Sequence, residues 1–129
     1  GAHVHGYIEE LAAVVAELKA SNRPGFGASA AALETALLDF IAATRFLQDA
    51  VAAGRMDEAL AGATPYLRLF ALASGAVYLA KGALADDTPA RTALCRFFAE
   101  NLVGETAALR TRVIGGGASL AEAARDLFA

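Results

Sequence analysis

The sequence predicts an all-α fold, an antiparallel four-helix bundle followed by a short extra C-terminal helix. Three observations support this prediction. Apolar residues recur with helical spacing in four long segments of the 129-residue chain. The alternating Val, Ile and Thr pattern that is typical of half-buried strands is absent. The connections between segments are short and contain glycine or proline, which favours helices that lie side by side in opposite directions.

The first two predicted helices have clear apolar stripes. The first helix is predicted over residues 6–20. Its stripe consists of Ile8, Leu11, Val15 and Leu18, and Val4 continues the same spacing just before the helix. A proline and two glycines predict a loop over residues 21–27, with Ser29 as the N-cap of the next helix. The stripe of residues 29–53 is Leu33, Leu37, Phe40, Thr44, Leu47 and Val51. Gly54 is expected to end this helix in the left-handed region.

The third predicted helix begins near Asp57 and ends before Asp86. One side of it holds Leu60, Thr64, Leu67, Ala71, Ser74, Tyr78 and Gly82. The opposite side is also apolar, so the helix is either central in the fold or covered by a partner. Pro65 lacks the backbone N–H that a helical hydrogen bond needs, so we expect a kink or a short break there.

The fourth predicted helix begins with Thr88 as its N-cap and Pro89 at its first position. It is expected to span residues 89–114 and to end at the glycine run 115–117. A serine and a glutamate with capping-box spacing then predict a last short helix over residues 120–128.

Composition excludes several classes of protein. A chain with 57% hydrophobic and 19% charged residues is too apolar to be disordered. The net charge is −3 and the basic residues form no stripe, so we expect no nucleic-acid partner. The charge-free run 69–80 is shorter than the ~20 residues of a membrane span, so we expect no membrane partner. A single cysteine and the absence of a secretory leader favour a cytoplasmic location.

Few residues carry chemistry, and we predict no catalytic, cofactor-binding or metal-binding residue in this chain. His3 and His5 are two residues apart, whereas two metal ligands on one helix face need a spacing of three or four. Cys95 has no histidine to act as its base, so we predict a packing role for it. The glycine run 115–117 follows a helix and lacks the lysine of a phosphate loop, so we predict that it terminates that helix.

Two groups of residues are predicted to have specific roles. Asn101 and Glu105 share one face of the fourth helix with Leu94, Phe98 and Leu102, and this face is expected to project into the bundle. A buried carboxylate needs hydrogen-bond donors or a proton, so we expect an internal polar network. Its predicted members are Ser74, Tyr78, Asn101 and Glu105. The predicted partner interface, on the second and third helices, consists of Leu38, Phe46, Tyr66, Leu69, Phe70 and Leu72.

Two ordered strings in the sequence resemble a known family. One is Tyr-Leu-Arg-Leu-Phe at residues 66–70, and the other is Phe-Phe-Ala-Glu at residues 97–100. Both resemble the C-terminal helical domain of bacterial acyl-CoA dehydrogenases, the acetyl-CoA dehydrogenase-like C-terminal domain. The resemblance implies that residues 1–129 form a single helical domain that is a fragment of a larger flavoprotein. It also implies that FAD, the catalytic base and the oxidation of an acyl-CoA thioester belong to that flavoprotein.

The leading hypothesis is therefore a non-catalytic packing and oligomerisation domain of an FAD-dependent acyl-CoA dehydrogenase-like oxidoreductase. Its expected partners are the remainder of that flavoprotein and further copies of the chain. The alternative is a free-standing bundle that binds a small apolar ligand such as an acyl chain. That alternative requires a cavity above roughly 300 Å³, lined by Phe40, Phe70, Tyr78 and Phe98. A third hypothesis, an independent enzyme that uses Glu105, requires this side chain to be connected to solvent.

Overall fold

The computed structural model describes residues 2–21 and 23–129, and these residues form an all-α fold without strands. The α-helices are α1 (Ala2–Ala20), α2 (Ser29–Ala52), α3 (Met56–Ala85), α4 (Pro89–Asn101) and α5 (Thr106–Phe128). Two single-turn 3-10 helices are η1 (Pro24–Phe26) and η2 (Val103–Glu105). The predicted fold class is confirmed in this respect.

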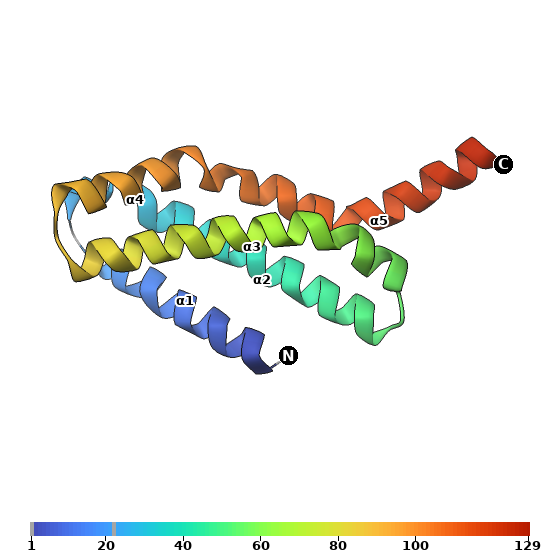
Figure 1. Cartoon of the computed structure of the whole chain (residues 1–129), viewed down its shortest axis with the longest axis horizontal. Helices are drawn as coiled ribbons and strands as arrows, with labels where there is room; N and C mark the ends of the chain where they lie inside the picture. Colours follow the sequence, from blue (N-terminus) through green and yellow to red (C-terminus); the bar gives the residue numbers. More distant parts are fainter. Residues whose placement is uncertain (1, 22) are drawn as a thin grey trace.

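Successive long helices reverse direction along the long axis of the molecule, and α4 and α5 together form one rod beside α3 (Figure 1). α2, α3 and the α4–α5 rod pack against one another. α1 packs on α2 and α3, on the side opposite to the α4–α5 rod, and covers only part of their length (Figure 1). The last turns of α5 project beyond the end of the α2–α3 pair.

The core combines small and large apolar side chains. Phe40 is completely buried, and its ring centroid lies 5.6 Å from those of Tyr66 and Phe70. The apolar stripes predicted for the first two helices are confirmed along most of their length, because the following residues are buried: Leu11, Val15, Leu18, Leu33, Leu37, Phe40 and Thr44. Val51, at the end of the α2 stripe, is exposed.

α3 continues through Pro65 without the short break that the sequence suggested as one outcome. Its buried residues are Ala59, Gly62, Pro65, Leu69, Leu72, Ala73, Ser74, Ala76, Val77, Ala80 and Ala83. Small residues dominate this set, and they let the axes of neighbouring helices approach closely. The side that carries Leu60, Leu67 and Tyr78 faces solvent instead.

α3 is also long and apolar enough to cross a membrane when only length and composition are considered. The central helix of a bundle meets the same two criteria. α3 packs against α1, α2, α4 and α5, and 44% of its most apolar stretch is buried. These contacts fit a central helix of the fold.

The fourth and fifth predicted helices differ from the observed ones. The predicted helix 89–114 is divided at η2, and the glycine run 115–117 lies inside α5 rather than at a helix end. A Cβ atom at Gly117 would lie 2.9 Å from the Glu58 Cα, so the missing side chain lets α5 cross close to α3. Packing against α3 thereby keeps the run helical, against a propensity cost of ~1 kcal/mol per glycine.

Two of the predicted helix-end features are confirmed. Thr88 caps α4 by accepting a hydrogen bond from the Arg91 N–H, with Pro89 in the first turn. Gly54 has φ = 75°, as expected for a residue that ends a helix in the left-handed region. The prediction for Ser29 is wrong by one residue, because Ala28 occupies the N-cap and the Ser29 hydroxyl donates to the Phe26 carbonyl of η1.

Candidate functional site

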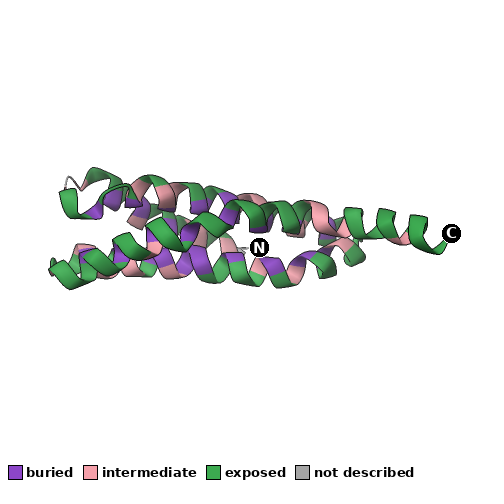
Figure 2. Cartoon of the chain, turned by 90° about the horizontal axis from the view of Figure 1, so that it is seen from above, coloured by how far each residue is buried: buried purple, intermediate pink, exposed green. Residues whose placement is uncertain are grey.

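Large apolar side chains remain exposed in three places on the surface. The α3–α4 face consists of Leu67, Tyr78, Leu94 and Leu102 with the half-buried Phe98. The open corner consists of Val51, Met56 and Leu60 with the half-buried Leu47. The α5 overhang is residues 118–128, in which Leu120, Leu127 and Phe128 are exposed. Figure 2 shows that the projecting turns of α5 are exposed almost throughout.

The α3–α4 face is a strip of uncharged surface. Leu67 and Tyr78 lie three helical turns apart on the same side of α3 and are 66% and 55% exposed. α4 runs alongside α3 here, since a Cβ atom added at Gly75 of α3 would lie 3.6 Å from the Phe98 ring of α4. An ion pair of 2.7 Å between Arg68 and Glu105 borders the strip at one end. Apolar residues of two helices therefore share one surface.

The open corner lies beyond the start of α1, where the end of α2 and the start of α3 are left uncovered (Figure 1). A groove of about 570 Å³ is present there, lined by His5, Leu47, Gln48, Val51 and Ala52. The last stacking contact of α1 on α3 is between Tyr7 and Phe70, with ring centroids 5.6 Å apart. α1 begins only five residues before Tyr7. It therefore does not cover the first residues of α3, which include Met56 and Leu60.

The α5 overhang continues the buried side of α5. Thr106, Leu109 and Val113 are buried against the bundle, and the same helical spacing leads on to Leu120 and Leu127. These two residues are exposed because α5 extends beyond the end of α2 and the start of α3 (Figure 1).

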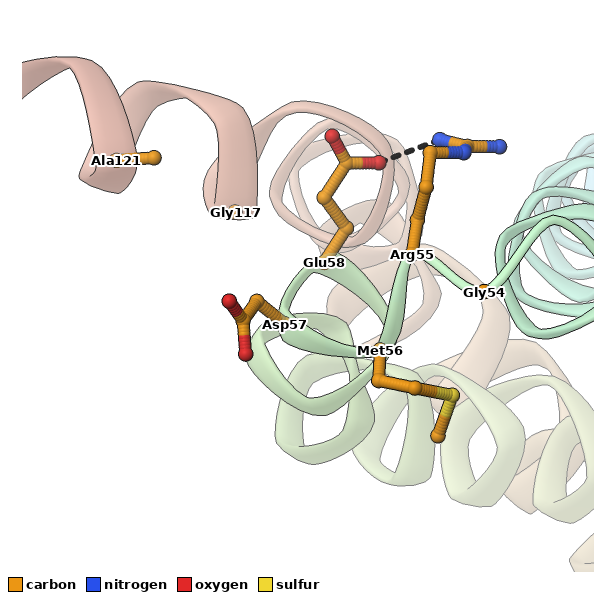
Figure 3. A pocket seen from close by; sticks show the side chains of 7 residues that line it. All are labelled: Gly54, Arg55, Met56, Asp57, Glu58, Gly117 and Ala121. Carbon is orange, nitrogen blue, oxygen red and sulfur yellow. Dashed lines mark hydrogen bonds and ion pairs between the residues drawn. The ribbon is translucent and has the colours of Figure 1, made fainter.

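A shallow pocket of about 360 Å³ marks the point where α5 passes the start of α3. Gly117 and Ala121 of α5 lie opposite Asp57 and Glu58, and Met56 points away from them (Figure 3). The Glu58 carboxylate is engaged by Arg55 in an ion pair. The pocket combines two carboxylates with one paired cation and has no nucleophile or histidine.

The six predicted interface residues have different environments. Leu69 and Leu72 are buried inside the chain, and this corrects their assignment to a partner surface. Leu38 is exposed, Phe70 is partly exposed and stacks on Tyr7, and Phe46 is half-buried with Arg55 over its ring.

Tyr66, the sixth, is half-buried. Its hydroxyl shares a hydrogen bond of 2.9 Å with Thr44. This bond links α3 to α2 inside the chain.

The predicted internal network does not form, and this is a second correction. Glu105 is at the surface in its ion pair with Arg68, and the Asn101 side chain donates to the Phe97 carbonyl of its own helix. Tyr78 is exposed, and the buried Ser74 hydroxyl has no partner within the described residues. The physical reason is that the helix is divided at η2, because α4 ends at Asn101 and Glu105 belongs to η2. The two side chains therefore do not share one face that points into the bundle.

A different buried carboxylate was missed by the sequence analysis. Asp39 of α2 is buried, and its two oxygens accept hydrogen bonds from the Thr106 hydroxyl (2.9 Å) and from Arg110 (3.3 Å). The available signal was its position between Ala36 and Ala43, on a second side of α2 formed by alanines. Asp39 links α2 to α5.

Cys95 has the environment of a packing residue. Its side chain is buried, and desolvation raises the pKa of the thiol, partly opposed by a hydrogen bond with Ser29. A thiol with a raised pKa stays protonated near neutral pH and is a poor nucleophile. Tyr78 also has a raised pKa, chiefly because of its hydrogen bond with Tyr7.

The described residues contain no cluster of three or more His, Cys, Asp or Glu side chains that could hold a metal ion. His3 and His5 are exposed on α1.

The four aromatic residues that a ligand cavity would need do not converge on one. Phe40 and Phe70 pack against each other, whereas Phe98 lies beside Gly75 on another side of α3. The pocket next to Tyr78 holds about 10 Å³, which is less than an acyl chain requires.

A comparison with protein families places this geometry in context. The family model for the acetyl-CoA dehydrogenase C-terminal-like domain matches residues 7–124, which extends from α1 into the α5 overhang. No curated protein and no solved structure matched the chain. The family match covers most of the chain and agrees with the resemblance of residues 66–70 and 97–100. The chain therefore belongs to the acetyl-CoA dehydrogenase C-terminal-like family.

Proposed function

We propose that this chain is a non-catalytic packing and oligomerisation domain, folded as an antiparallel bundle, that packs against the body of an FAD-dependent acyl-CoA dehydrogenase-like enzyme and against a second copy of itself. The family match supports the connection to such an enzyme. The α3–α4 face is the observation that carries the packing role, because a strip of exposed apolar residues from two helices is typical of an interaction surface.

The size of the α3–α4 face suits a protein contact. Its five large side chains, at roughly 100 Å² each, would remove roughly 500 Å² of apolar surface from water. A standard contact buries about 800 Å² per partner, of which about 57% is apolar. The face therefore supplies the apolar part of one such contact. Leu38 and Phe70, which remain partly or largely exposed, are further proposed contacts.

The FAD and the acyl-CoA oxidation are assigned to the body and not to this chain. A flavin pyrophosphate needs positive charge or N–H donors. The pocket at the start of α3 is instead lined by Asp57 and Glu58, and Arg55 is already paired. This pocket does not suit FAD. A cytoplasmic enzyme from a bacterium is part of the same proposal.

The test begins with the natural coding sequence upstream of residue 1, which the proposal expects to encode an FAD-binding body. That body, produced without this domain, is titrated with the 129-residue chain in an analytical ultracentrifuge. The wild-type chain is expected to bind. Leu67→Asp and Leu94→Asp should each weaken binding by at least about tenfold, because each places a charge in the apolar contact.

The matched control is Ala13→Asp, which adds the same charge on the outer side of α1. It should leave binding unchanged. Binding that tolerates both substitutions on the α3–α4 face would contradict the packing role. Turnover of an acyl-CoA by the isolated chain with an artificial electron acceptor would contradict the non-catalytic assignment.

A further inference from the structure

The α5 overhang keeps an amphipathic pattern although most of its residues are exposed in the single chain. Leu120, Ala124 and Leu127 lie on one side, in line with the buried Val113. The charged residues Glu122, Arg125 and Asp126 lie on the opposite side. An isolated helix of this length gains little from its own hydrogen bonds in water, so its stability depends on burial of the apolar side. The stripe therefore indicates a partner.

The open corner is the complementary feature of the same chain. α1 lies along α2 and α3 at one end of the molecule and leaves their other end uncovered (Figure 1). The groove at the corner runs along Leu47 and Val51 of α2, in line with His5 near the start of α1. A helix placed there would extend the row occupied by α1.

A two-fold rotation brings the two features together. In Figure 1 the α5 overhang projects past one end of the molecule on the side opposite to α1, and the open corner is at that same end on the α1 side. Rotation by half a turn about an axis perpendicular to the plane of Figure 1 exchanges these sides. The overhang of each copy then lies over the open corner of the other, and the contact closes as an isologous dimer.

We propose that two copies of this chain dimerise reciprocally, with the α5 overhang of each copy docked in the open corner of the other. The inference names a partner for the oligomerisation part of the proposed function and rests on that part. It uses other residues than the α3–α4 face, and of these Leu60 lies two helical turns from Leu67 on the same side of α3.

The area available is sufficient for a stable dimer. Each copy contributes six exposed large apolar residues: Val51, Met56, Leu60, Leu120, Leu127 and Phe128. At roughly 100 Å² each they bury roughly 1,200 Å² over the two copies, which reaches the lower end of the range for specific interfaces.

The first experiment measures the mass of the 129-residue chain by analytical ultracentrifugation over a range of concentrations. The wild-type chain is expected to dimerise. Leu127→Asp and Leu60→Asp should each raise the dissociation constant by at least about 100-fold, because each substitution occurs twice in the dimer. Both side chains are exposed in the single chain, so circular dichroism should show unchanged folding. Ala13→Asp is the matched control and should still dimerise.

The second experiment identifies the docking partners. Chains carrying Leu127→Cys are mixed with chains carrying Val51→Cys and are oxidised gently, while the native Cys95 is buried and does not compete. A disulfide between the two different chains supports the inference. A wild-type monomer at all concentrations would overturn it. A disulfide formed only within the Leu127→Cys population would also overturn it, because overhangs would then pair with each other.

The outcomes separate this inference from the proposed function. Leu94→Asp on the α3–α4 face should weaken binding to the flavoprotein body and leave the dimer intact. Leu127→Asp should abolish the dimer and leave binding to the body intact. Loss of one property alone therefore shows which of the two ideas has failed.

Discussion

The three glycines at positions 115–117 have different surroundings although they are neighbours in one helix. A Cβ at Gly115 or Gly116 would meet nothing within 4 Å, whereas a Cβ at Gly117 would meet the α3 backbone at Glu58. Only the last of these glycines is required by packing. Gly115 and Gly116 lower the stability of α5, and no close contact among the described residues requires a glycine at either position.

We predict that Gly117→Ala lowers the free energy of unfolding by about 1–3 kcal/mol, because the added methyl group pushes α5 away from α3. Gly116→Ala is the matched control and should raise it by roughly 0.5–1 kcal/mol, because alanine loses less entropy in a helix. Urea unfolding measures both values. Equal effects of the two substitutions would show that α5 does not cross α3 at Gly117.

The buried thiol of Cys95 predicts a dependence of stability on pH. Its pKa is raised above the ordinary value of 9.0, so the folded chain holds this proton to a higher pH than the unfolded chain does. The associated stability is complete below that ordinary value and is lost as the pH rises through the raised value. Wild-type protein should therefore lose stability more steeply than Cys95→Ala as the pH rises above about 9. Parallel pH profiles from urea unfolding would contradict this prediction.

At the scale of elements, Asp39 connects α2 to α5 by hydrogen bonds within the bundle. We predict that Asp39→Ala costs about 1–3 kcal/mol of stability, because the buried Thr106 hydroxyl loses its partner. Asp49→Ala, on the exposed side of the same helix, should stay within about 0.5 kcal/mol of wild type.

A double-mutant cycle distinguishes the two partners of Asp39. The coupling of Asp39 to Thr106 should exceed its coupling to Arg110, whose side chain is 47% exposed and is screened by water. A larger coupling to Arg110 would show that the ion pair and not the buried hydrogen bond holds the helices together.

The two halves of α5 should differ in hydrogen exchange. Residues 106–117 pack on the bundle, whereas most of residues 118–128 are exposed in the single chain and are covered only in the proposed dimer. At low protein concentration, amides of the overhang should exchange faster than those of the first half. At high concentration the overhang should become protected, unless Leu127→Asp is present. Protection of the overhang at every concentration would mean that it folds back on its own chain.

At the scale of the whole molecule, dimerisation makes thermal stability depend on protein concentration. Association stabilises the folded state by mass action, so the Tm of the wild-type chain should rise as the concentration rises. Leu127→Asp should have a Tm that does not change with concentration, and Ala13→Asp should behave like wild type. Calorimetry over a hundredfold range of concentration provides the measurement. A constant wild-type Tm would contradict the dimer.

The sequence predicted α1 and α2 well because large apolar residues mark their buried sides. The same reasoning selected Leu94, Phe98 and Leu102 for the inward side of the fourth helix, whereas Thr92, Cys95 and Ala99 are the buried residues of α4. On α4 the small residues form the contacts with the neighbouring helices and the large ones are left outside. Periodicity of large side chains then indicates the wrong side.

By itself the sequence determined that the chain is helical, where α1 and α2 bury their apolar stripes, and which family it resembles. These properties depend on local spacing and on ordered strings of residues. Only the tertiary structure decided which side of α3 is buried, that α5 continues through the glycine run, and that Asp39 is the buried carboxylate. Each of these depends on how closely two helix axes approach, and this distance is set by side chains that are far apart in the sequence.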